Sequence, residues 1–205
     1  MKPILFSTSM VQAILDGRKT MTRRVIKPQP TYELRLIDGP SYKNEFHEIL
    51  PNEKADPVTF STIGARYMPK YQPGDVLWVR ETWAEPLNDF GNYVYKASCW
   101  DDIVSQVKWR SPITMPREAA RLFLKVTDVR VERVQDISTS DCEREGITSD
   151  IERFNGHMIP HHDWIVGEFS KLWDSINAKR GYGWDSNPWV WVYSFKRIGN
   201  PGVDA

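Results

Sequence analysis

The sequence predicts an α+β fold in which strands predominate: a small mixed β-barrel with short flanking helices and one long insertion. Five or six segments read as strands, few segments have helical spacing, and strands and helices do not alternate in a βαβ rhythm. At 205 residues the chain suffices for one domain with large loops. We assign residues 1–198 to this domain and residues 199–205 to a loose C-terminal tail.

The first elements are predicted to be a strand, a helix and a second strand. Residues 4–6 are apolar and form the first strand. Ser7 or Ser9 then caps a helix whose apolar positions share one face, and Gly17 ends it. The second strand is expected over residues 22–26.

Residues 31–70 show no sustained hydrophobic period, and we interpret them as a long insertion on the domain. Regular structure resumes after a turn signature at residues 72–75, with a strand over residues 76–83. Residues 92–97 are expected to pair with that strand as a hairpin.

The C-terminal half contains three clear elements. Residues 122–134 are rich in β-branched side chains and predict one bent strand or two. A capping box, Ser138 with Asp141 or Ser140 with Glu143, starts a short helix that Gly146 ends. Apolar residues at helical spacing over residues 165–176 predict a longer helix, and an aromatic strand over residues 189–195 closes the domain.

Composition limits the function classes. Lysine plus arginine and aspartate plus glutamate both number 27, so any nucleic-acid contact must come from a local pocket rather than from a basic surface. Cys99 and Cys142 lack metal-ligand spacing and are expected to remain thiols in a reducing cytoplasm. No apolar run has the length of a membrane span, so no membrane contact is expected.

The most informative segment surrounds a lysine and a threonine three residues apart: Gly17-Arg18-Lys19-Thr20-Met21-Thr22-Arg23-Arg24. A threonine hydroxyl becomes a nucleophile only when a base takes its proton, and a lysine serves as that base only if its pKa is lowered. The neighbouring arginines lower a lysine pKa by like-charge repulsion, and they also attract phosphate or carboxylate.

The chain resembles the ASCH family, whose fold is a β-barrel related to the PUA RNA-binding domain. The resemblance rests on the opening helix with the basic segment, on Pro73-Gly74-Asp75-Val76-Leu77, on the element from Asp136 to Ile147, and on the closing aromatic strand. Two phrases, Arg80-Glu81-Thr82-Trp83 and Gly181 to Trp189, further resemble a subgroup common in bacterial prophages.

Within that family, small acetylcytidine amidohydrolases carry a similar Gly-Arg-Lys-Thr-x-Thr segment. The resemblance implies a catalytic set of Thr22 as nucleophile, Lys19 as base and Glu145 as the group that orients the lysine, without metal or organic cofactor. It also implies that Arg24 fixes the ligand or the glutamate. This chain departs from those enzymes by its greater length and by Arg23 and Arg24, which stand where they have an apolar–basic pair.

Other polar and aromatic residues complete the candidate ligand contacts: Arg18, Arg23, Arg24, Trp78, Glu81 and Trp83. Trp78 and Trp83 fall on opposite faces of one expected strand, which places one in the core and the other in the pocket. Trp189, Trp191 and Tyr193 share a face, which indicates core packing, with a base-stacking platform as the alternative. His157, His161 and His162 suggest a metal site, but Pro160 prevents a helical pair.

Two functions remain open at this level. The first is an amidohydrolase that deacylates N-acyl cytidine or cytosine. The second is a non-catalytic binding module for RNA or a modified base, or a ribonuclease, of prophage origin. In both cases the expected partner is a modified nucleoside or RNA; the oligomeric state stays open.

Overall fold

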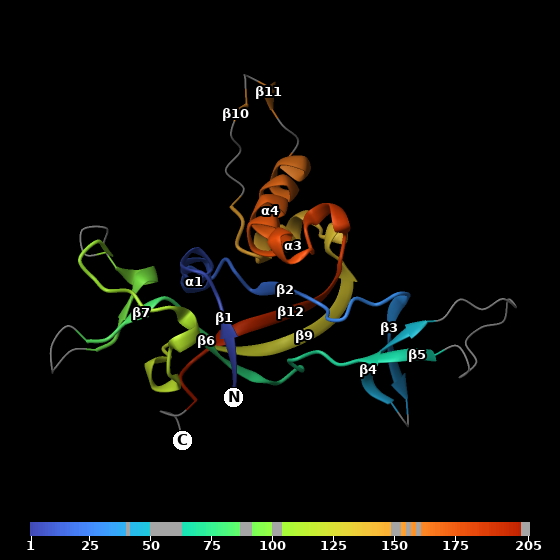
Figure 1. Ribbon diagram of the computed structural model, residues 1–205, viewed down its shortest axis with the longest axis horizontal. Helices are drawn as coiled ribbons and strands as arrows, with labels where there is room; N and C mark the ends of the chain where they lie inside the picture. Colours follow the sequence, from blue (N-terminus) through green and yellow to red (C-terminus); the bar gives the residue numbers. More distant parts are fainter. Residues whose placement is uncertain are drawn as a thin grey trace, which may run out of the picture.

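The computed structural model describes residues 1–39, 42–49, 63–86, 92–99, 104–148, 153–154, 157–158 and 161–201. Its centre is a five-stranded sheet in the order β1-β6-β9-β12-β2 (Figure 1). The strands are β1 (Lys2–Leu5), β6 (Val76–Arg80), β9 (Phe123–Arg133), β12 (Trp189–Ile198) and β2 (Met21–Val25). Only β1 and β6 pair in parallel; the other three pairings are antiparallel. The predicted α+β class is therefore confirmed.

The expected barrel is not closed by hydrogen-bonded strands in the described part of the chain. β1 and β2 are the two edges of the sheet, and helix α1 (Thr8–Leu15) connects them. The sheet curves enough for the Nη2 of Arg24, on β2, to donate a hydrogen bond to the carbonyl of Leu5, on β1, at 3.0 Å. We call the space between these two strands the β1–β2 gap.

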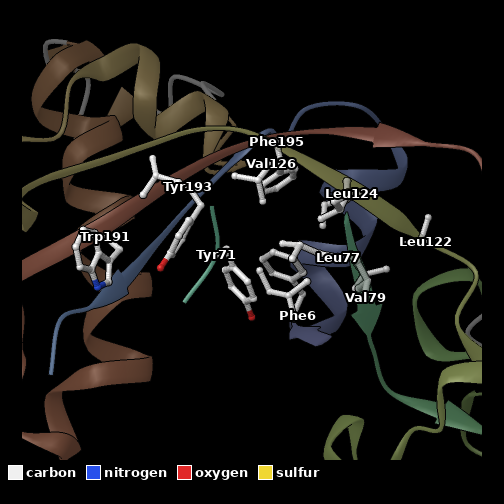
Figure 2. Packing of buried hydrophobic residues seen from close by; sticks show 14 of the residues in the cluster. Phe6, Tyr71, Leu77, Val79, Leu122, Leu124, Val126, Trp191, Tyr193 and Phe195 are labelled. Carbon is white, nitrogen blue, oxygen red and sulfur yellow. The ribbon is translucent and has the colours of Figure 1, made fainter. Parts of the chain in front are cut away.

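One face of the sheet carries the main core (Figure 2). Trp191, Tyr193 and Phe195 alternate along β12 and are at most 6% exposed. Tyr193 packs edge-on against Tyr71 with ring centroids 5.1 Å apart. The core interpretation of these aromatic residues is confirmed for Trp191 and Tyr193, and Trp189 packs partly buried against the same cluster.

The opposite face of β2 and β12 is covered by helices α3 (Thr139–Arg144) and α4 (His161–Asn177) (Figure 1). Val190 and Val192 point to this face because successive strand residues alternate sides. Phe169 and Trp173 of α4 pack against them in the second core cluster. β2 is thus covered on both faces, although its outer edge is unpaired in the part of the chain that the structure describes.

The short helices begin and end as the sequence predicts. Ser7 caps α1 by accepting from the amide of Met10, and Ser138 caps α3 by accepting from that of Asp141 at 3.2 Å. Gly17 follows α1 with φ +77°, a conformation that favours glycine.

Residues 31–70 contain regular structure that the sequence did not reveal. β3 (Glu33–Gly39), β4 (Tyr42–Ile49) and β5 (Ile63–Tyr67) form a separate antiparallel sheet. The pattern fails because burial does not follow polarity: Leu36 is 51% exposed, whereas Glu48 is 7% exposed. The other parts of the insertion, residues 40–41 and 50–62, lie outside the described residues.

The strand expected over residues 76–83 is divided. β6 ends at Arg80, and β7 (Trp83–Ala84) pairs instead with β8 (Val94–Tyr95), as part of the expected hairpin. Residues 123–133 form the single strand β9. The remaining strands are β10 (Arg153–Phe154) and β11 (His157–Met158). Short 3₁₀ turns occur at Lys96–Ser98, Pro112–Thr114, Arg117–Ala119, Val134–Asp136, Ala178–Arg180 and Trp184–Ser186.

Candidate functional site

A cavity of about 580 Å³ lies at the β1–β2 gap. Residues Pro3, Ile4 and Leu5 of β1 line it on one side, and residues 22–25 of β2 line it on the other. Phe169, Leu172 and Trp173 of α4 also line it. Because β2 pairs only with β12, half of its backbone hydrogen-bonding groups face away from the sheet toward the gap.

Lys19 and Glu145 form a buried ion pair beside this cavity. The Nζ of Lys19 lies 2.6 Å from Oε2 of Glu145 and donates a second hydrogen bond to the Glu145 carbonyl at 2.7 Å. Their side chains are 0% and 4% exposed. The two residues come from the turn after α1 and from the end of α3, so the fold brings together residues that are 126 positions apart.

Gly146 allows this approach. Its φ is +95°, and a Cβ at this position would lie 2.9 Å from Cβ of Ala13 and 3.3 Å from Cβ of Lys19. The neighbouring backbone is held as well, because Thr20 donates from its amide to the carbonyl of Arg144 at 2.8 Å. A side chain at position 146 would therefore push α1 and Lys19 away from Glu145.

Arg23 joins this pair to a larger buried network. Its Nη1 lies 3.2 Å from Oε1 of Glu145, and its Nη2 lies 2.9 Å from Oδ2 of Asp141. Its Nε also donates to Glu132 at 2.8 Å. Arg130 pairs with the same two carboxylates, Glu132 and Asp141. The network balances three cations with three carboxylates, which compensates for their burial.

Thr22 is 1% exposed and lines the cavity. Its Oγ1 accepts a hydrogen bond from Nη1 of Arg24 at 2.8 Å. A guanidinium beside a hydroxyl stabilises the alkoxide form of that hydroxyl. Between Lys19 and Thr22, both of which are described, the structure contains no hydrogen bond; the Lys19 ammonium is engaged by Glu145.

Burial determines the electrostatics of this site. Desolvation lowers the pKa of Lys19 below its ordinary value of 10.5, although Glu145 opposes the shift, and Arg24 and Arg23 add to it. Burial also lowers the pKa of Arg24. For Arg23 burial acts in the same sense, but Glu145, Glu132 and Asp141 together raise its pKa.

The structure places five of the residues singled out from the sequence around one cavity. Thr22, Arg23, Arg24 and Glu145 line it, and Lys19 contacts Glu145 directly behind it. Arg18 is outside the lining and bonds to Asp16 and to the carbonyl of Gly146.

The remaining three candidates do not line the cavity. Trp78 is 8% exposed and Trp83 is 4% exposed, so both are packed away and neither serves as the expected pocket wall. The expectation failed because Trp78 and Trp83 lie on two different strands, β6 and β7, so the alternation of side chains along one strand does not relate them. Glu81 is buried at 1% exposure and forms a two-point ion pair with Arg121.

Among the residues that the structure describes, no group of three or more histidine, cysteine, aspartate or glutamate residues is placed to hold a metal ion. The side chains of His157, His161 and His162 lie outside the described part.

Both thiols, Cys99 and Cys142, are free, and burial raises the pKa of Cys142 to about 12. No helix in the described ranges is long and apolar enough to cross a membrane.

Sequence reasoning missed two groups of residues. The first group is Arg130 and Glu132, which are two residues apart on β9 and therefore lie on the same face of the sheet, with Arg23. Their alternation along β9 was the one signal in the sequence that could have indicated this. Lys27, Lys70 and Arg180 also line the cavity, but they come from three separate segments without a common motif.

Comparisons with known proteins add little. No family model matches the chain, and no curated protein matches it. Among solved structures, the chain is similar to protein EF3133 from Enterococcus faecalis V583, of family DUF984, with a TM-score of 0.42 and 10% sequence identity. The alignment covers 97% of this chain and 82% of that chain. A similarity at this level carries no conclusion about activity.

Proposed function

We propose that this protein is an ASCH-type amidohydrolase with a PUA-like fold, which removes an acyl group from the exocyclic amine of cytidine or cytosine. One observation carries the proposal. Glu145, which holds the buried Lys19 at 2.6 Å, and Thr22, whose hydroxyl accepts from Arg24, line the same cavity. A nucleophile, a lysine with a lowered pKa and a carboxylate that orients it are the parts that acyl transfer requires.

The chemistry proceeds in two stages. The Oγ1 of Thr22 attacks the acyl carbonyl carbon while Lys19, which must be in its neutral form for this step, accepts the hydroxyl proton. The carbon–nitrogen bond then breaks, the departing amine takes that proton, and the acyl group remains as an ester on Thr22. Water hydrolyses the ester, releases the carboxylic acid and restores the hydroxyl. The net reaction is amide plus water to amine plus acid.

Each neighbouring group has a role in this scheme. Arg24 stabilises the Thr22 alkoxide through the 2.8 Å hydrogen bond. Glu145 holds the Lys19 side chain, and Arg23 shares the Glu145 charge, which favours the neutral lysine. Because Lys19 does not contact Thr22 directly, substrate binding must turn its Nζ toward the hydroxyl, or a water must relay the proton.

The test is turnover of a panel of N-acyl cytosines and cytidines, followed by chromatography. Wild type is expected to release cytosine or cytidine, Thr22→Ala to be inactive, and Thr22→Ser to retain activity. Thr20→Ala is the matched control, because Thr20 is two residues away and does not line the cavity. Turnover by Thr22→Ala at the wild-type rate would refute the assignment.

A second function is favoured by one specific observation. The ammonium of Lys19 donates two hydrogen bonds to Glu145 and none to Thr22 in the described structure. A site with this geometry holds a modified base without reacting with it. Tight binding of an acylated cytidine without release of product would support this binding module instead.

A further inference from the structure

The cavity at the β1–β2 gap has a charge imbalance that the chain as a whole lacks. Cationic and acidic residues both number 27 in the full sequence. The cavity is lined by six cationic residues: Arg23, Arg24, Lys27, Lys70, Arg80 and Arg180. Glu145 is the sole acidic residue among the described residues that line it. Such concentration of one charge in a concave site favours an anionic ligand.

Within the described residues, carboxylates neutralise only part of this imbalance. Arg23 is engaged by carboxylates, and Glu145 is already shared between Lys19 and Arg23. By contrast, Lys27, Lys70 and Arg180 form no ion pair with any carboxylate of the described residues. All three are exposed, whereas Thr22 is 1% exposed.

Lys27 contacts Tyr182 in space, and Arg180 is close to Tyr182 in the sequence. The Nζ of Lys27 lies 4.8 Å from the centroid of the Tyr182 ring, and Arg180 is two residues before that tyrosine. The segment is fixed to the end of α4, because Trp173 donates from its ring nitrogen to the carbonyl of Tyr182 at 2.8 Å. Lys27 lies five residues beyond Thr22, at most about 17 Å of extended chain.

We infer that the ligand of this cavity is phosphorylated: a cytidine nucleotide whose base lies toward Thr22 and whose phosphate binds Lys27 and Arg180. The identity of the base rests on the proposed function, whereas the phosphate contact rests on the cavity charges alone. The cavity volume of about 580 Å³ is within the range of roughly 300–1,000 Å³ of small-molecule sites. The phosphate comes from a free nucleotide or from a single-stranded RNA, and both carry the same chemistry.

The test is calorimetric binding of cytidine 5′-monophosphate and of cytidine to the full-length protein. The monophosphate is expected to bind about tenfold more tightly, because two solvent-screened charge contacts add to its affinity. The double variant Lys27→Met/Arg180→Met is expected to lose this advantage and to bind cytidine as wild type does. Lys179→Met is the matched control, because Lys179 precedes Arg180 in the same 3₁₀ turn and does not line the cavity.

The outcomes separate the two proposals. Equal affinity for cytidine and its monophosphate would overturn the inference, even if acylated cytidine is hydrolysed. An advantage of the monophosphate that disappears in the double variant would support it, even if no acylated substrate is turned over. A single-stranded oligocytidylate serves as the second probe: tighter binding than the monophosphate identifies RNA as the source of the phosphate, and weaker binding identifies the free nucleotide.

Discussion

Gly146 offers a sharp test of how the site is assembled. Gly146→Ala places a methyl group 2.9 Å from Cβ of Ala13 and 3.3 Å from Cβ of Lys19, at φ +95°. An L-residue in the left-handed region costs about 1–2 kcal/mol. Overpacking adds about 1–3 kcal/mol, because both neighbours are buried. The expected loss in the free energy of unfolding is therefore about 3 kcal/mol.

Gly17→Ala is the matched control for this substitution. Gly17 has φ +77°, but nothing lies within 4 Å of its added Cβ, so only the backbone cost of about 1 kcal/mol applies. Urea denaturation followed by tryptophan fluorescence measures both variants. Ala13→Gly in the Gly146→Ala background is expected to recover part of the contact cost, as a positive coupling between the two sites. Equal losses for Gly146→Ala and Gly17→Ala would refute the packing argument.

Further predictions concern three buried residues, Lys19, Cys142 and Glu81. Lys19→Met is expected to cost about 3 kcal/mol at pH 7, at the low end for a broken buried pair because Arg23 still holds Glu145. Because the folded-state pKa of Lys19 is lowered, the native state binds fewer protons than the unfolded state between that pKa and 10.5. In that pH window the free energy of unfolding of the wild type should therefore rise with pH relative to that of Lys19→Met. Parallel pH profiles of the two proteins would contradict this. Iodoacetamide at pH 8 is expected to alkylate Cys99 but not the buried Cys142, because the pKa of Cys142 is raised to about 12. Mass spectrometry of the native protein after treatment measures both reactions. Alkylation of Cys142 at the same rate as Cys99 would count against its burial. Glu81→Gln is expected to lower the free energy of unfolding by about 3 kcal/mol, because it breaks the buried pair with Arg121. Turnover per folded molecule should not change, since Glu81 does not line the cavity. A loss of turnover without a loss of stability would instead mean that Glu81 contributes to the site.

The parts of the fold that follow local rules were predictable from the sequence. The caps at Ser7 and Ser138 and the stop at Gly17 depend on a few neighbouring residues, and each is where the pattern indicates. The aromatic alternation of β12 was readable because one face of that strand enters the core. The sheet of β3, β4 and β5 was not readable, because Leu36 is exposed there while Glu48 is buried, and polarity then gives no period.

The same distinction between local patterns and distant contacts applies to the site. The pairing of Lys19 with Glu145 was available only through the family resemblance, since no local rule joins two residues so distant in sequence. The position of Trp83 could not be predicted, because the chain leaves the main sheet after Arg80 and Trp83 enters a different one. Lys27 and Arg180 both line the cavity, and only tertiary packing brings two residues so distant in sequence there.

The most direct measurement is the intact mass of the protein trapped with an N-acyl cytidine, followed by peptide mapping. If Thr22 is the nucleophile, wild type gains the mass of one acyl group on the peptide that contains Thr22, and Thr22→Ala gains none. Release of cytidine without an acyl group on Thr22, or with undiminished turnover in Thr22→Ala, would contradict the account.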